Sequence, residues 1–172
     1  MKTLFPDYRP AWLTDERAEL LDHANEFAQK ELAPNQERWA EQHQVDRDFW
    51  RKAGDSGLLC MSIPEEYGGG GGTFAHEAVV LEEQASAGDD AFGNSVHSGI
   101  VAHYVLKYGT EEQKHAWLPK LASGELVGAI AMTEPGTGSD LANISTTAKL
   151  SEDGSHYVLD GAKTFITGGA LA

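Results

Sequence analysis

The segment Ala129-Ile130-Ala131-Met132-Thr133-Glu134-Pro135-Gly136-Thr137-Gly138-Ser139-Asp140 joins an apolar run to a turn rich in glycine and small hydroxyl residues. Glycine has no Cβ, so the main chain can lie flat against a planar or phosphorylated group, and threonine and serine add hydroxyls that form hydrogen bonds. The alternative is an ordinary turn, since Pro-Gly pairs are common in loops of every kind. This segment alone leaves both interpretations open.

Three more segments narrow the choice. Ile63–Gly69 has the sequence IPEEYGG, Tyr108–Gln113 has YGTEEQ, and Gly161–Gly169 has GAKTFITGG. In this order the four segments resemble the acyl-CoA dehydrogenase family. His97–Val101, with the sequence HSGIV, is most similar to the long-chain branch of that family. The resemblance extends from about Asp15 to the last residue, which is nearly the whole chain.

The resemblance implies an α+β fold. An all-α helical domain is expected over residues 1–125, and the first part of a middle antiparallel β domain over residues 126–172. A full subunit of the family continues through the rest of the β domain into a C-terminal helical bundle. The chain is therefore expected to be the N-terminal part of such a subunit, truncated before the bundle and inactive alone.

Helical periodicity covers the first two-thirds of the chain. Thr14 is a candidate N-cap before an apolar repeat that should kink or end at Pro34, and a second helix is expected after Asp46. A longer helix is expected over Phe92–Tyr108. Thr110–Gln113, which follows it, has the spacing of a capping box.

The pattern changes to strands near Gly124. A continuous apolar run is followed by an alternating segment, and Asp153-Gly154 is typical of a hairpin turn. The expected strands cover Leu126–Met132, Ile144–Leu150, Tyr157–Leu159 and Lys163–Ile166.

Composition limits the classes of function. The formal net charge is −14 with no basic run, so no nucleic-acid partner is expected. Cys60 is the one cysteine and lies among apolar neighbours, which indicates a core position and a reducing compartment. No apolar run reaches the roughly 18 residues of a membrane helix, and the first residues lack the apolar core of a signal peptide. A cytoplasmic location without membrane contact is expected.

Two other features carry weaker signals. Gly68–Gly72 has no Gly-Lys-Ser/Thr after it, so a flexible connector is favoured over a phosphate loop. His97 and His103 have no partner at ligand spacing, so no metal site is expected. In the family the helix that carries Gly93, Ser95 and Gly99 lines the acyl pocket. These small residues leave room for an acyl chain or allow close helix packing.

The resemblance implies FAD as cofactor. Met132 and Thr133 would flank the isoalloxazine edge, with the following turn directed toward the diphosphate, and Ser139 would also touch acyl-CoA. Phe165 would cover the ring and the Thr167 hydroxyl would bond flavin N5, although the family often has tryptophan at the first of these positions. The implied cofactor-binding residues are Ile130, Ala131, Met132, Thr133, Glu134, Pro135, Gly136, Thr137, Gly138 and Ser139 in a first segment, and Phe165, Ile166 and Thr167 in a second.

No catalytic residue is assigned. In the family a glutamate of the C-terminal bundle removes the α-proton of a fatty acyl-CoA thioester while the β-hydrogen leaves as hydride to the flavin, giving trans-2-enoyl-CoA. Acidic character alone does not promote any glutamate of this chain to that role. The glutamates set aside are Glu65, Glu66, Glu82, Glu83 and Glu134.

The implied function is FAD-dependent dehydrogenation of fatty acyl-CoA in β-oxidation. An electron-transfer flavoprotein would accept the electrons, and the full-length protein would form a homotetramer. Two alternatives stay open. One is oxidation of acyl-CoA by oxygen on the same fold, and the other is a non-catalytic helical subunit that completes an oligomer.

Overall fold

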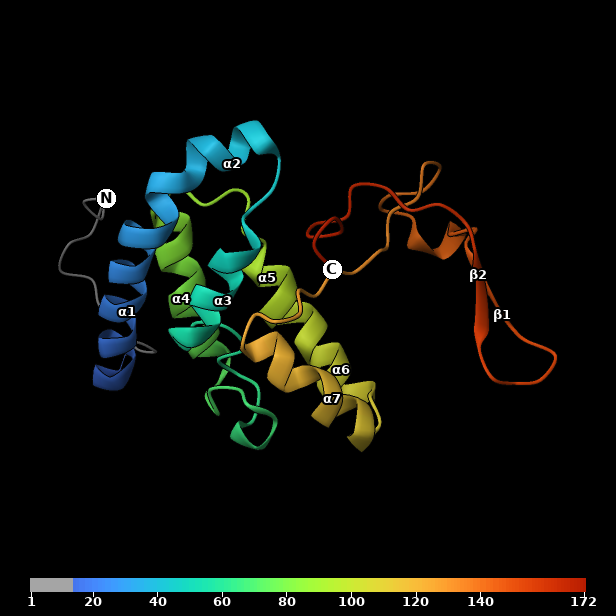
Figure 1. Cartoon of the computed structure of the whole chain (residues 1–172), viewed down its shortest axis with the longest axis horizontal. Coiled ribbons are helices and arrows are strands. Elements are labelled where there is room, and N and C mark those ends of the chain that lie inside the picture. Colours follow the sequence, from blue (N-terminus) through green and yellow to red (C-terminus); the bar gives the residue numbers. More distant parts are fainter. Residues whose placement is uncertain (1–13) are drawn as a thin grey trace.

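The computed structural model describes residues 14–172, which form a helical domain followed by an extended arm that ends in a β-hairpin (Figure 1). This arrangement confirms the expected α+β fold. The α-helices are α1 (Asp15–Phe27), α2 (Gln36–Gln42), α3 (Arg47–Asp55), α4 (Phe74–Ser86), α5 (Asn94–Val96), α6 (Ala102–Tyr108) and α7 (Glu111–Ala122). The strands are β1 (Thr147–Leu150) and β2 (Tyr157–Asp160).

The helices begin and end near the expected residues. The Thr14 side chain accepts a hydrogen bond from Arg17 N, which confirms the N-cap of α1. Pro34 lies in a short 3₁₀ turn between α1 and α2, because proline has no N–H to continue an α-helix. Two π-helical turns, Ala28–Leu32 and His97–Val101, were not expected, and the second joins α5 to α6.

Aromatic rings fill the centre of the helical domain. Phe49 and Trp50 of α3 lie against Phe92, with ring centroids 4.7 and 4.4 Å apart, and Trp39 of α2 lies 4.8 Å from Phe49. All four rings are at most 4% exposed. Rings at these separations and tilts contribute more than their buried area alone. The short helix α3 thus holds α2 and the Phe92 segment together.

The glycine run is not a free connector. The N–H groups of Gly70, Gly71 and Gly72 donate to the carbonyls of Cys60, Ile63 and Met61 at 2.9 to 3.1 Å. These amides are therefore unavailable to a phosphate. The expectation of a flexible connector is wrong, because the glycine run folds back and bonds to residues 60–63. Cys60 itself is fully buried, as expected, and burial raises the pKa of its thiol to about 12.

Two of the four expected strands form. β1 and β2 pair antiparallel, with Leu150 opposite Tyr157, and Gly154 takes the left-handed conformation in the turn between them. The expectation of strands at 126–132 and 163–166 is wrong for the described structure. The backbone hydrogen bond between these regions runs from Thr164 N to Thr133 O at 3.0 Å, one residue beyond the first expected strand, and a ladder needs several in succession.

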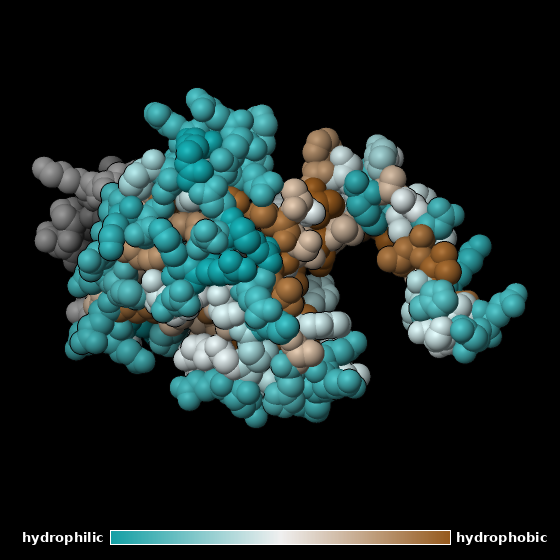
Figure 2. Space-filling view, in the orientation of Figure 1, coloured by the Kyte–Doolittle hydropathy of each residue, from teal (hydrophilic) through white to brown (hydrophobic). Residues whose placement is uncertain are grey.

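The hairpin leaves both faces open. Every residue of β1 and β2 is exposed, including Leu150, Tyr157, Val158 and Leu159. Figure 2 shows apolar surface across this hairpin and on the neighbouring side of the helical domain. The hairpin therefore contributes little to the core, which is made mostly by the helices.

Thr110 offers a test of the capping box at the start of α7. Its side chain accepts from Gln113 N at 3.2 Å, and Gln113 Oε1 accepts from Thr110 N at 2.9 Å. Thr110→Ala should lower the free energy of unfolding by about 1 kcal/mol, because one helix-end donor loses its acceptor. Urea denaturation measures the change. Thr110→Ser is the control and should stay near wild type, whereas equal losses in both variants would contradict the role of the hydroxyl.

Candidate functional site

The structure brings the two expected cofactor segments together. Thr164 N donates to Thr133 O, and a Cβ placed on Gly168 would lie 3.6 Å from Gly128 O. One segment rises in number as the other falls, so the two run antiparallel. Ile130–Met132 and Phe165–Thr167 lie between these two points of contact.

The carboxylate of Glu134 holds this part of the arm. Oε2 accepts from Ser145 N and Ser145 Oγ, both at 2.7 Å, and Oε1 accepts from Thr146 N and Lys163 Nζ, both at 2.9 Å. Hydrogen bonds from Thr146, Ser145 and Lys163 hold the pKa of Glu134 well below its usual 4.5. Glu134 as a whole is 4% exposed. Glu134 therefore stays ionised and orders the loop, so its carboxylate is not a free base.

The turn after Glu134 is closed by its own backbone. Glu134 N donates to Thr137 O, and Thr137 N donates back to Glu134 O. Neither Gly136 nor Gly138 takes a left-handed φ, and a Cβ on either would meet no described atom within 4 Å. The backbone conformation and the packing of the described residues therefore do not require glycine here. Missing side chains at such positions leave the main chain open to a ligand.

Three hydroxyls in the two segments have no hydrogen-bond partner in the part of the chain that the structure describes. The side chains of Thr133, Ser139 and Thr167 make no hydrogen bond to any residue within 14–172. Phe165 is 91% exposed and has a φ of 56°, which is uncommon for a residue other than glycine. Free hydroxyls beside an exposed ring and open glycines fit a polar, planar ligand with a phosphate group.

The three small residues of the helix after Phe92 do not form one wall. Gly93 and Ser95 line a hollow of about 240 Å³ together with residues of α4, whereas Gly99 lines a separate hollow of about 260 Å³ with Ile100, His103 and Tyr104. The described residues therefore place Gly93 and Ser95 at one hollow and Gly99 at another. A Cβ on Gly93 would also meet Thr167 Cγ2 at 2.8 Å.

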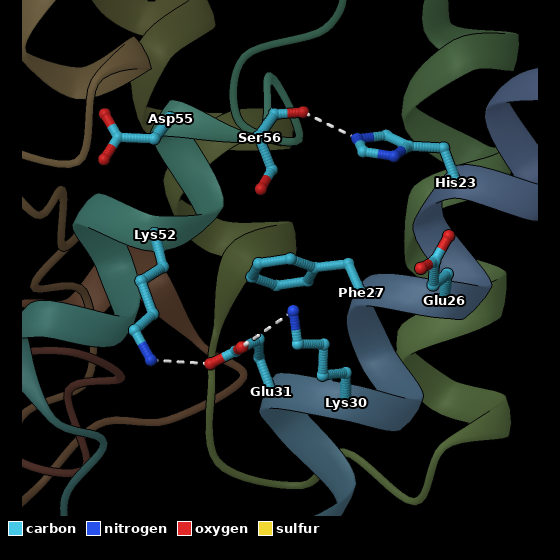
Figure 3. Close-up of a pocket in the computed structure, with 8 residues that line it drawn as sticks. All are labelled: His23, Glu26, Phe27, Lys30, Glu31, Lys52, Asp55 and Ser56. Carbon is cyan, nitrogen blue, oxygen red and sulfur yellow. Dashed lines mark hydrogen bonds and ion pairs between the residues drawn. The ribbon is translucent and has the colours of Figure 1, made fainter.

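A larger hollow of about 370 Å³ lies between α1 and α3 (Figure 3). His23 Nε2 pairs with Ser56 O at 2.9 Å, and Lys52 donates to Glu31 at 2.6 Å. Phe27 projects between these polar pairs. Figure 1 places α1 on the far side of the helical domain from the arm, and no residue of the two expected cofactor segments lines this hollow.

Other groups bear on what the site does. Of the glutamates set aside, Glu83 is 8% exposed and accepts from Asn25. Within 14–172 no three His, Cys, Asp or Glu side chains come together as metal ligands, and no described helix is long and apolar enough to cross a membrane.

Sequence reasoning missed Ser145 and Lys163 as partners of Glu134. No local spacing links residues 11 and 29 positions apart.

Comparison with known proteins agrees with this architecture. Residues 14–125 match the acyl-CoA dehydrogenase N-terminal domain, and residues 129–172 match the acyl-CoA dehydrogenase middle domain. The chain belongs to the acyl-CoA dehydrogenase family, whose members are oxidoreductases. The resemblance drawn from the four sequence segments is thereby confirmed.

Individual relatives extend the match. The mitochondrial long-chain specific acyl-CoA dehydrogenase of Sus scrofa is 44% identical over 151 residues, which cover 88% of this chain and 35% of that protein. The chain thus spans about a third of that relative's length. An acyl-CoA dehydrogenase structure from Geobacillus kaustophilus aligns with a TM-score of 0.90 and 44% identity, covering 95% of this chain and 43% of the other. A Bacillus anthracis acyl-CoA dehydrogenase complexed with FAD aligns at 0.88 and 39%, covering 96% and 28%.

Replacing Glu134 tests the electrostatic lock on the arm. Glu134→Gln should lower the melting temperature at pH 7, because Lys163 loses its anionic partner. The stabilisation by Glu134 is present above the usual pKa of 4.5 and is lost as pH falls through the lower folded-state pKa. The gap between wild type and variant should therefore shrink toward about pH 3. Calorimetry at both pH values measures it.

Glu152→Gln is the matched control, since this carboxylate is exposed in the hairpin turn. It should leave the melting temperature unchanged at both pH values. A gap for Glu134→Gln that stays the same from neutral to acid pH would mean that its charge does not stabilise the loop.

Proposed function

We propose that the chain carries part of the FAD-binding site of an enzyme that oxidises fatty acyl-CoA thioesters to trans-2-enoyl-CoA. The open backbone at Gly136 and Gly138 beside the unpartnered hydroxyls of Thr133 and Ser139 is the observation that carries this proposal. The FAD in the Bacillus anthracis relative supports the choice of cofactor. The identity with a long-chain dehydrogenase supports the substrate class.

The residues present fit such a cofactor. Thr133 and Thr167 would hold the edge of the isoalloxazine through their hydroxyls, and the glycines of the turn would admit the diphosphate. A flavin held there would supply the hydride-accepting chemistry, and these residues would contribute its position and electrostatics. Phe165 is exposed and would exclude water from one side of the ring. The Ser139 hydroxyl would donate to or accept from a second ligand, which we propose is acyl-CoA.

The electron acceptor divides two enzyme classes. We propose an electron-transfer flavoprotein, with a homotetramer as the working assembly. No carboxylate of the described residues is proposed as the base, since Glu134 is engaged by the loop. Oxidation by oxygen on the same fold is the alternative, and the product of reoxidation separates the two.

Activity measurements on the full-length protein test the function. Purified protein should carry FAD, and palmitoyl-CoA should be converted to its trans-2-enoyl product with reduction of added electron-transfer flavoprotein. Stoichiometric hydrogen peroxide without such an acceptor would instead favour the oxidase. Protein that binds no FAD and forms no enoyl-CoA would refute the proposal.

Thr167→Val removes the hydroxyl at nearly constant volume. A lost hydrogen bond to flavin N5 should weaken flavin binding or transition-state stabilisation by roughly 1–3 kcal/mol. Flavin absorbance and steady-state turnover measure the two effects. Thr147→Val, on the exposed strand β1, is the control and should behave as wild type. Unchanged flavin content and turnover in Thr167→Val would show that this hydroxyl does not reach the flavin.

Gly99→Leu tests whether the hollow beside Gly99 takes an acyl chain. A Cβ on Gly99 would meet no described atom within 4 Å, so the variant should fold. Filling an occupied cavity costs roughly 1–3 kcal/mol for the group displaced. The ratio of kcat/KM for long over short acyl-CoA should therefore fall. An unchanged ratio would place the acyl chain elsewhere.

A further inference from the structure

His97 is a fully buried polar side chain that the proposed chemistry does not use. It lies in the π-helical turn His97–Val101, is 0% exposed, and its ring stands 4.9 Å from that of Trp50 in α3. A buried polar ring is costly unless its nitrogens are satisfied. Its partners therefore explain why it is tolerated there.

Both ring nitrogens bond to backbone from other parts of the chain. Gly128 N donates to Nδ1 at 2.9 Å, and Nε2 pairs with Leu121 O, near the end of α7, at 3.0 Å. A backbone N–H can only donate and a carbonyl can only accept. The ring is therefore neutral, with its proton on Nε2. Burial lowers the pKa of His97 to about 4, and the nearby Arg47 charge acts in the same direction.

The contact with Gly128 is close. A Cβ on Gly128 would meet Val101 Cγ1 at 2.8 Å and His97 Nδ1 at 3.5 Å, so the backbone lies directly against the helix. The next three residues, 129–131, make no hydrogen bond to another residue within 14–172. Among the described residues, the bond to His97 is thus the last hydrogen bond between this segment and the helical domain before Met132 and Thr133.

We propose that His97 is a positioning residue for the flavin segment: its ring joins the end of α7 to Gly128 and thereby sets where Met132 and Thr133 meet the isoalloxazine. The proposal rests on the proposed function. A group held about 1 Å from its productive place can cost on the order of 10²-fold in rate. An anchor two residues before Ile130 controls that kind of displacement.

Two matched variants separate the two bonds. The amide oxygen of asparagine stands as many bonds from Cα as Nδ1, and the amide nitrogen of glutamine as many as Nε2. His97→Asn therefore keeps an acceptor for Gly128, and His97→Gln keeps a donor for Leu121 O. Each variant loses one bond and buries one amide group, so their melting temperatures should fall by similar amounts.

Hydrogen exchange and flavin measurements on the full-length protein then decide. Peptides that span 126–133 should lose about tenfold in protection in His97→Gln but not in His97→Asn, since one hydrogen bond is worth about that factor. FAD affinity or kcat should fall about tenfold or more in His97→Gln and stay near wild type in His97→Asn. Equal exchange and equal flavin binding in the two variants would overturn the proposal and leave His97 a core residue.

The failure of the proposed function would look different. If wild-type protein bound no FAD, the proposed function would be refuted. The difference in hydrogen exchange of peptides 126–133 between His97→Gln and His97→Asn would then decide whether His97 anchors Gly128. If His97→Gln did not fold, ¹⁵N chemical shifts of the wild-type ring would decide. They should show a neutral Nε2–H ring with a hydrogen-bonded Nδ1 between about pH 5 and 8. A proton on Nδ1 would overturn the proposal.

Discussion

The arm takes its shape from one buried charge. Glu134 collects donors from Ser145, Thr146 and Lys163, so three stretches that share no regular secondary structure converge on a single carboxylate. An ionised group below the surface is stable only when its oxygens are satisfied in this way. The turn that contains Gly136 and Gly138 begins at Glu134 itself. The hairpin begins directly after its partners Ser145 and Thr146.

The helical domain reaches the arm through side chains that bond to backbone. His97 holds Gly128, while Arg47 donates to Leu171 O at 2.7 Å and also to Glu125 O. Both lie in or beside the aromatic core, so the packing of α3 against Phe92 supports the placing of segments far along the chain. These two side chains thereby fix the position of the candidate cofactor segments relative to the helical core.

Local signals in the sequence predicted the helices well. Thr14, Pro34 and the box at Thr110 act within a few residues of themselves, so their chemistry is visible in the sequence. The strands at 126–132 and 163–166 failed because a ladder depends on a partner that apolar periodicity does not identify. The candidate site likewise has a part that the sequence predicted and a part that it did not. Its two segments were found by resemblance, and their contact agrees with it, but the residues around Glu134 and His97 are joined over distances that no spacing rule covers.

The π-helical turn at His97–Val101 has a consequence for how this helix can change. Such a turn holds one residue more than an α-helical turn. Deleting that residue would rotate everything after it by about 100° relative to α5. Buried Ala102 would then leave the core, or His97 would turn away from Gly128. Insertions and deletions are therefore expected to be tolerated in the exposed hairpin turn and to be destabilising in this helix. There the extra residue sets which side chains face the arm.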